Sequence, residues 1–196
     1  MGYSVKKIWY FDKPGEENTR DAISAAIERA SELGITRMVV ASTSGKTAQT
    51  AAELIKGREI SLIVVSHAVG FSTPGVWEFD QAIATRLRAD GIAIVTGTHV
   101  LSGLERAFSS APKVGGGSRS EAVAEALRRT VAIGVKVAVE CVLIAADQGA
   151  IPVSEEVMAL GGTGSGADTA CVIRPSHTNR FFDLQIREIV AMHRYR

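Results

Sequence analysis

Residues 38–47 read Met38-Val39-Val40-Ala41-Ser42-Thr43-Ser44-Gly45-Lys46-Thr47, and a helix-like segment follows them to Lys56. The apolar, β-branched run predicts a buried strand that ends in a small, hydroxyl-rich turn and passes directly into a helix. The first N–H groups of a helix have no partner within the helix and lie at its positive end. We therefore expect this turn to bind an anion.

Phosphate is the anion that the side chains of this turn favour. Lys46 supplies a positive charge. Four residues can donate a hydroxyl group: Ser42, Thr43, Ser44 and Thr47. The alternative is that Ser44 merely caps the helix, but one cap needs a single hydroxyl and three precede Gly45. A triphosphate-binding loop would need a glycine where Val40 stands, so ATPase and GTPase activities are not expected.

The composition predicts one globular domain over residues 1–196, because 46% hydrophobic residues in a chain of this length can bury a full core. The formal net charge of +1 gives no electrostatic reason to expect nucleic acid or an anionic membrane surface as a partner. No segment is apolar enough to span a membrane, and the first residues lack the pattern of a signal peptide. Cys141 and Cys171 lie in apolar runs and are expected to be buried free thiols, which fits a cytoplasmic protein.

The same order of helix, glycine, apolar strand and small polar residues occurs four times along the chain. Strands are expected at 36–40, 60–65, 92–95 and 157–160. Strands that are apolar on successive residues must be covered on both faces, so the pattern predicts an open, doubly wound parallel α/β sheet. Residues 169–173 form a fifth expected strand, which follows its predecessor too closely for a crossover helix and is therefore an antiparallel edge strand. Residues 181–196 combine helical spacing with extended character, and both states stay open.

Three further features concern the helices. The apolar spacing from Val76 to Leu87 predicts a helix. Ser118 and Glu121 form a capping box, and a second anion site at that helix end is an open alternative to a simple turn. Gly134 is expected to divide the long helical segment 121–146 into two helices.

Ligands of such sheets bind at the carboxyl ends of the strands, where this chain places hydroxyl, histidine and glycine residues. The candidate ligand-binding residues at these ends are His67, Thr96, Gly97, Thr98, His99, Gly162, Thr163, Gly164, Gly166 and Asp168. His67 and His99 could each contact a ligand or transfer a proton. Asp168 could bind a ligand hydroxyl or N–H group, or it could structure its turn.

The sequence does not support several other kinds of site. Neither candidate histidine has a carboxylate or cysteine at zinc-ligand spacing, so no metal site is expected. Gly162 and Gly164 match the letters of a dinucleotide-binding fingerprint, but a strand rather than a helix follows them. Glu140 is interpreted as an exposed or paired helix residue rather than a general base. No complete catalytic set can be assembled from these residues.

Four stretches of the chain resemble one protein family. Ser42-Thr43-Ser44-Gly45-Lys46-Thr47-Ala48 resembles the effector-phosphate loop in the carboxy-terminal domain of pyruvate kinase. Gly162-Thr163-Gly164-Ser165-Gly166-Ala167-Asp168-Thr169-Ala170 resembles the signature of stand-alone archaeal and bacterial proteins built on that domain alone. The stretches Tyr10-Phe11-x-Lys13-Pro14-Gly15-x-x-Asn18-Thr19 and Phe181-Phe182-Asp183 also resemble this stand-alone family. The similarity thus spans nearly the whole chain.

The resemblance implies a three-layer α/β/α fold like that of the pyruvate kinase C-terminal domain, with a mostly parallel five-stranded sheet and one antiparallel strand. It implies no pyruvate kinase activity, because nothing in the chain resembles the catalytic barrel of that enzyme. In the stand-alone relatives the implied ligand is flavin mononucleotide (FMN), whose phosphate would lie on residues 42–47. His67, residues 96–99 and residues 162–168 would then border the ribityl chain and the flavin ring.

The leading hypothesis is a cytoplasmic FMN-binding protein, and it extends to a role as an oxidoreductase. The alternative is a non-catalytic sensor that binds a sugar phosphate or another phosphorylated metabolite and acts through a partner. A third hypothesis is a phosphotransfer or isomerase enzyme that uses His67 or His99. Homo-oligomerisation is an open expectation, because small α/β domains often pair.

Overall fold

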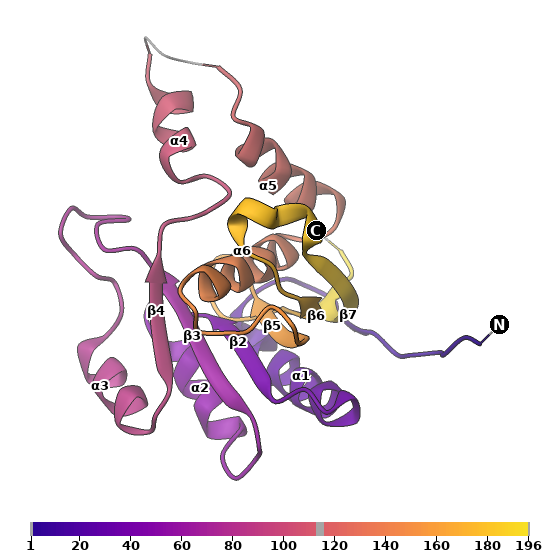
Figure 1. Ribbon diagram of the computed structural model, residues 1–196. Helices are drawn as coiled ribbons and strands as arrows, with labels where there is room; N and C mark the ends of the chain where they lie inside the picture. The colour runs from indigo at the N-terminus through magenta and orange to yellow at the C-terminus, as the bar shows by residue number, and fades with distance from the viewer. Residues whose placement is uncertain (1, 113–115, 196) are drawn as a thin grey trace.

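A seven-stranded sheet runs through the centre of the computed structural model, which describes residues 2–112 and 116–195 (Figure 1). The strands are β1 (Trp9–Phe11), β2 (Arg37–Ala41), β3 (Ser61–His67), β4 (Ala93–Gly97), β5 (Val157–Gly161), β6 (Thr169–Arg174) and β7 (Gln185–His193). Their order is β1-β7-β6-β5-β2-β3-β4, and among these strands only β6 runs antiparallel to its neighbours. The carboxyl ends of β2, β3, β4 and β5 therefore lie at one edge of the sheet.

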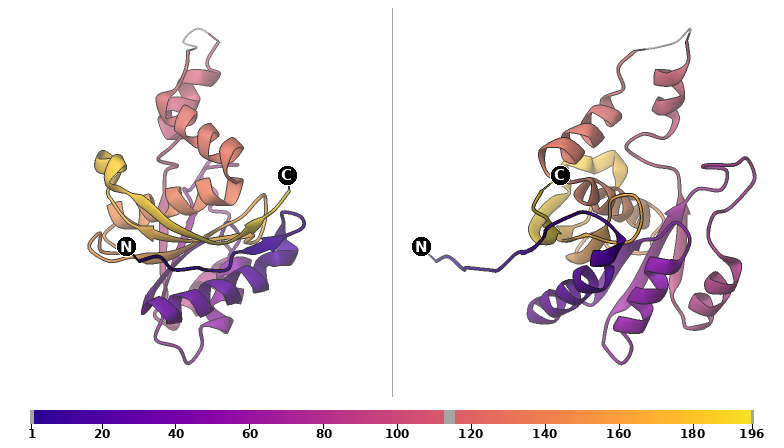
Figure 2. Two further views of the ribbon diagram at one scale, coloured as in Figure 1. Left: turned by 90° about the vertical axis from the view of Figure 1, so that its right-hand side faces the viewer. Right: turned by 180° about the vertical axis from the view of Figure 1, so that it is seen from behind.

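Helices cover both faces of this sheet (Figures 1 and 2). One face carries α1 (Thr19–Leu33), α2 (Lys46–Leu54) and α3 (Gln81–Ala89), and the other carries α6 (Ile133–Asp147). Outside α6 lie α5 (Arg119–Thr130) and α4 (Gly103–Ser110), which project from the body of the molecule. The short 3₁₀ helices are η1 (Glu16–Asn18) and η2 (Thr178–Asp183). Among the described residues, no helix combines the length and the apolar character needed to cross a membrane.

The side chains of β2 explain why the central strands are apolar at successive positions. Met38 and Val40 pack in the core beneath α1, α2 and α3, whereas Val39 packs in the core beneath α6. All three residues are fully buried. Because successive side chains of a strand point to opposite faces, a sheet with two covered faces requires apolar residues at both. The structure thus confirms the predicted three-layer, mostly parallel α/β fold.

The predicted count of five strands was wrong, because β7 and β1 extend the sheet beyond β6. β6 is antiparallel to β5, as expected, but it lies inside the sheet rather than at its edge. The tail that forms β7 has a mixed pattern, since Glu188 pairs with Arg29 of α1 at 2.6 Å between Oε1 and Nη2. A charged residue thus occupies a position that faces a helix, and the period-2 apolar signal of a strand is lost.

The helix boundaries agree in part with the sequence analysis. α3 begins at Gln81, later than the spacing from Val76 predicted, because Asp80 caps it. The Asp80 carboxylate accepts a hydrogen bond from the Ile83 N–H at 2.9 Å, as a residue at the start of a helix does. The predicted division of the long helical segment is confirmed, since α5 and α6 separate just before Gly134.

Two glycines let α6 approach the sheet closely. A Cβ atom built on Gly161 of β5 would lie 2.2 Å from the Gly134 carbonyl oxygen, and one built on Gly134 would lie 2.1 Å from the Thr169 hydroxyl oxygen. Neither position has room for a side chain. The contact therefore seats the first turns of α6 directly above the carboxyl ends of the strands.

We expect Gly161→Ala to lower the free energy of unfolding by about 1–3 kcal/mol, the typical cost of overpacking a close contact. Urea unfolding monitored by circular dichroism measures this change. Gly117→Ala is the matched control, because a Cβ atom there would meet nothing within 4 Å, and its effect should stay within about 1 kcal/mol. Equal stabilities of the two variants would contradict the proposed close approach.

Candidate functional site

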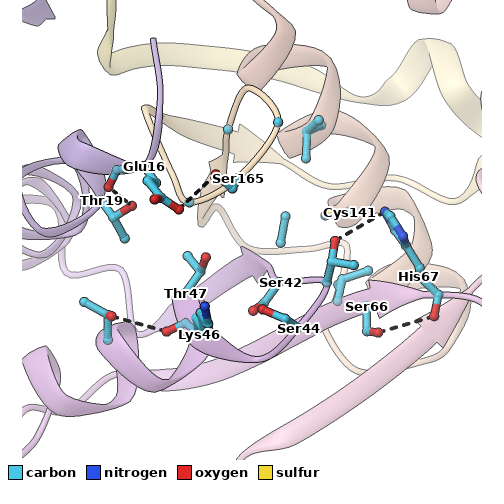
Figure 3. A pocket seen from close by; sticks show the side chains of 18 of the residues that line it. Glu16, Thr19, Ser42, Ser44, Lys46, Thr47, Ser66, His67, Cys141 and Ser165 are labelled. Carbon is cyan, nitrogen blue, oxygen red and sulfur yellow. Dashed lines mark hydrogen bonds between the residues drawn. The ribbon is translucent and has the colours of Figure 1, made fainter. Parts of the chain in front are cut away.

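A cavity of about 740 Å³ opens at the carboxyl ends of the parallel strands (Figure 3). Its walls come from the turn between β2 and α2, the ends of β3 and β4, one side of α6, the loop after β5 and the start of α1. This volume lies in the usual range for small-molecule sites, and the position is the one at which doubly wound sheets bind ligands.

The turn before α2 presents a row of backbone N–H groups to this pocket. The Ser42 N–H donates to the Val65 carbonyl at 2.9 Å, and the Ser42 hydroxyl accepts the Ala48 N–H at 3.3 Å. Between these two bonds, none of the N–H groups of residues 43–47 has a hydrogen-bond partner within the described part of the chain. Five consecutive donors at the start of a helix are the arrangement that binds phosphate.

The side chains of the turn add charge and hydroxyl groups to these donors. The helix is capped through Ser42 rather than Ser44, whose side chain makes no capping bond. Ser44, Lys46 and Thr47 all line the pocket (Figure 3). Arg20 of α1 is a second cation on the wall, 3.8 Å from Glu53 at its Nη1 atom. The expected anion site thus has its donors and its positive charge in one place.

Gly45 holds the turn in this conformation, although it does not line the pocket itself. Its φ of 97° lies in the left-handed region that favours glycine. A Cβ atom there would lie 2.8 Å from the Phe79 ring and 3.0 Å from Ile83. The Asp80 N–H also donates to the Ser44 carbonyl at 3.1 Å. The segment before α3 therefore supports the turn from behind.

His67 stands next to this turn at the end of β3. Its Nδ1 atom lies 2.8 Å from a carboxylate oxygen of Glu78, and its Nε2 atom lies 3.4 Å from the Thr43 hydroxyl. Hydrogen bonds from Ser72 and His67 hold the pKa of Glu78 below its usual range. Glu78 is therefore ionised near neutral pH and fixes the orientation of the His67 ring.

His99 occupies the corresponding position after β4 and belongs to a buried charged network. Its Nδ1 atom lies 2.7 Å from Glu140 Oε2, and the same oxygen accepts a hydrogen bond from the Lys136 ammonium group. The other carboxylate oxygen of Glu140 accepts the Leu101 N–H at 3.0 Å. Burial acts to raise the pKa of Glu140, but the hydrogen bond from His99 and the charge of Lys136 outweigh it and lower the pKa to about 2.

Glu140 is more closely involved in the pocket than its place in the sequence indicated. It is paired, as one of the two interpretations held, but it is 2% exposed and lines the pocket beside His99. The sequence did carry a sign of this pairing, because Lys136 and Glu140 lie four residues apart within an otherwise apolar helix. Two opposite charges on the buried side of a helix are costly unless they are paired.

Asp168 structures its turn, and its carboxylate does not line the pocket. One oxygen accepts the N–H groups of Gly15 and Thr163, each at 3.1 Å, and the other accepts the Thr169 hydroxyl at 2.8 Å. Asp168 is completely buried. It thus fastens the segment before α1 to the loop after β5, and both of these segments form pocket wall.

The structure brings most of the other predicted residues to the pocket. The predicted residues that line it are Ser42, Thr43, Ser44, Lys46, Thr47, His67, Gly97, His99, Gly162, Gly164 and Gly166, and those that do not are Gly45, Thr96, Thr98, Thr163 and Asp168. After β4, the alternation of an extended chain accounts for the division, because Gly97 and His99 face one way and Thr96 and Thr98 the other.

Two parts of the wall were missed. The first is the segment before and at the start of α1, which contributes Glu16, Glu17, Thr19 and Arg20. The second is an apolar face of α6 formed by Ile133, Val137, Cys141 and Ile144. These residues lie far from the strand ends in sequence. The rule that ligands bind at the carboxyl ends of strands therefore could not select them. Burial raises the pKa of the Cys141 thiol to about 12, which leaves it neutral.

The start of α5 is closed to a second anion. The Ser118 hydroxyl accepts the Glu121 N–H at 3.0 Å, which confirms the Ser118 half of the predicted capping box, whereas the Glu121 side chain binds the Ser109 hydroxyl at 2.8 Å. The Glu105 carboxylate accepts hydrogen bonds from the Ser118 hydroxyl and from the N–H and hydroxyl of Ser120. An anionic side chain of the protein itself thus fills this position. Over residues 2–112 and 116–195, no group of three or more histidine, cysteine or acidic residues could hold a metal ion.

Comparison with models of known protein families matches residues 20–173 to the family described as "Pyruvate kinase, alpha/beta domain". The matched range contains the turn before α2, His67, His99, Glu140 and the loop after β5. It excludes β1, β7 and the segment of the pocket wall that precedes α1. Most of the pocket is thus built from the part of the chain that matches.

The network around Glu140 predicts a dependence of stability on pH. Because the pKa of Glu140 is lower in the folded protein than the 4.5 of the free side chain, its ionisation stabilises the fold above pH 4.5, and this stabilisation is lost as the pH falls toward 2. We expect the Lys136→Met/Glu140→Gln double variant to lose less free energy of unfolding than the wild type when the pH falls through this interval. Urea unfolding at about pH 5 and about pH 3 measures both losses. Equal losses would mean that the fold does not hold Glu140 ionised.

Proposed function

The chain belongs to the pyruvate kinase alpha/beta domain family, and from this premise we propose that its pocket binds a phosphorylated small molecule, with FMN as the ligand. The observation that carries the proposal is the row of five N–H groups at residues 43–47, which have no partner in the described structure. With Lys46 beside them, they form a site for a phosphate group. We propose no pyruvate kinase activity for residues 1–196, since the family that they match is that of the alpha/beta domain.

The distribution of charge in the pocket supports one phosphate rather than two. Lys46 and Arg20 are the cations on the wall, and Arg20 already has Glu53 as an ion-pair partner. Glu16 and Glu17 lie on the wall beyond the turn. A second phosphate group at that end would be placed near carboxylates, which repel it. A monophosphate fits this distribution better than a bisphosphate.

The apolar face of α6 supports a ligand with a flat, apolar part. Ile133, Val137 and Ile144 line the pocket from one side of α6, opposite the polar turn. FMN combines a phosphate, a hydroxylated chain and a planar ring system, so its two ends match the two kinds of wall. In this proposal residues 43–47 hold the phosphate, and α6 with the loop after β5 borders the rest.

Bound FMN would supply hydride or single-electron transfer, and the proposal therefore includes an oxidoreductase role. The two cysteines are buried free thiols, as predicted, and a reducing cytoplasm is the compartment that we propose. A non-catalytic sensor of a sugar phosphate is the second candidate. In such a sensor the same turn would bind the phosphate of the sugar phosphate. The identity of the ligand therefore decides between the two functions.

We expect Lys46→Ala to weaken FMN binding about tenfold to a hundredfold, the effect of removing one hydrogen bond to a charged group. Gly45→Val should abolish binding, because the φ of 97° and the Phe79 ring leave no place for its side chain. Fluorescence titration of FMN measures both effects. Lys56→Ala is the matched control, since Lys56 is an exposed lysine beyond the far end of α2. Unchanged affinity in both turn variants would show that the phosphate does not bind at this turn.

The identity of the ligand can be tested directly on the wild-type protein. We expect calorimetry to show one FMN bound per chain and no heat of binding with fructose bisphosphate or simple sugar phosphates. The absorption spectrum of the freshly purified protein, followed by mass analysis of the small molecules that heat releases, gives an independent measurement. Binding of a sugar phosphate without binding of FMN would favour the sensor function and contradict the FMN proposal.

A further inference from the structure

The four histidines of the chain differ in what their ring nitrogens contact. Each has its Nδ1 atom within hydrogen-bond distance of an oxygen, and these oxygens belong to Glu78, Glu140, Asp147 and the Tyr195 carbonyl. Only His67 and His99 line the pocket. His67 has the Thr43 hydroxyl 3.4 Å from its Nε2 atom. The Nε2 atoms of His99 and His193 are both buried without a partner in the described structure, and of these two residues His99 lines the pocket.

The network behind His99 fixes which nitrogen carries the proton. Glu140 is ionised and accepts at its Oε2 atom, so the Nδ1 atom of His99 must be the donor of that hydrogen bond. Lys136 and the Leu101 N–H also donate to the same carboxylate. In the neutral ring, Nε2 is then an acceptor with a free lone pair. A buried acceptor without a partner is unfavourable unless a ligand supplies the donor.

A buried ion pair is also a costly way to hold a helix in place. The side chains of Lys136 and Glu140 are 2% and 3% exposed, and well-packed apolar residues would serve stability as well or better. What the pair provides is a carboxylate held at a fixed position with its charge balanced. A carboxylate bound to one nitrogen of an imidazole, with the other nitrogen free, is the arrangement that general acid–base catalysis uses.

We propose that His99 is the acid–base group of the pocket and that Glu140 and Lys136 are its positioning residues. The proposal rests on the proposed function, because it requires a ligand in the pocket. The Nε2 atom of neutral His99 takes a proton from an O–H or N–H group of the ligand. The ring becomes an imidazolium between the ligand anion and Glu140, and it returns the proton to the ligand in the reverse step. No other reactant is needed.

The groups around the His99 ring are compatible with this exchange. From α6 they are Glu140 and, bonded to it, Lys136, and from β3 it is His67, whose ring centroid lies 5.1 Å away. The Phe71 ring also lies against His99, at 4.9 Å between centroids. Phe71 is 43% exposed on the segment between β3 and α3, and the proposal requires this ring to move aside when a ligand reaches Nε2.

Nitrogen-15 NMR of the imidazole rings tests the proposal in the full-length protein. In the free protein, we expect His99 to show protonated Nδ1 and unprotonated Nε2. Saturation with FMN should move the Nε2 resonance toward that of a hydrogen-bonded or protonated nitrogen. His99→Gln identifies the resonance, and His177, which pairs with Asp147 outside the pocket, is the internal control. In the Lys136→Met/Glu140→Gln variant the two tautomers of His99 should mix, because the carboxylate that selects the Nδ1–H tautomer is gone.

Affinity measurements complete the test. His99→Gln should weaken FMN binding about tenfold, the loss of one hydrogen bond, and His177→Gln should leave it unchanged. If wild-type protein binds FMN while the His99 resonances stay unmoved, the acid–base role is wrong and the proposed function stands. If wild-type protein does not bind FMN at all, the proposed function is wrong, and this inference fails with it.

Discussion

The backbone contact between α6 and the sheet is the constraint on which the rest of the structure depends. Gly161 of β5 lies so close to the Gly134 carbonyl of α6 that it cannot carry a side chain, and Thr169 of β6 leaves no room for one on Gly134. Because α6 is seated this deeply, its apolar face becomes a wall of the pocket and Glu140 reaches His99 at the end of β4. A helix held a few ångströms further away would leave His99 without its carboxylate and would open the pocket to solvent.

Three carboxylates satisfy most of the donors at the carboxyl edge of the sheet. Glu78 binds His67, Glu140 binds His99 and the Leu101 N–H, and Asp168 binds two backbone N–H groups. The N–H groups of residues 43–47 have no such partner within the described chain. In the proposed function, these unpaired donors and Lys46 attract the phosphate of the ligand. A phosphate bound at this turn would determine where the remaining atoms of the ligand lie.

The fold and the anion site could be predicted to different extents. Apolar strands followed by small polar turns specify a layered α/β sheet, and the turn at Ser42–Thr47 carries its signal in consecutive residues. β7 escaped detection because Glu188 faces α1 in an ion pair with Arg29, which disrupts the strand pattern. The sequence did not place Glu140, Glu16 or Arg20 at the pocket, because their position there depends on packing between elements that are distant in sequence. Local patterns report hydrogen-bonding potential and burial, but they do not report which helix lies above which strand end.

Part of the pocket wall lies outside the residues that match the family. The match covers residues 20–173, yet the pocket wall includes Glu16 and Thr19, which precede that range. This segment is joined to the matched part through Asp168, which accepts the Gly15 N–H, and through Thr19, whose hydroxyl accepts the Ala167 N–H at 3.0 Å. Gly166 permits the contact, since a Cβ atom there would lie 2.4 Å from the Thr19 hydroxyl oxygen. The loop after β5 thus both lines the pocket and holds the segment that closes it, so a change in that loop alters two walls of the site together.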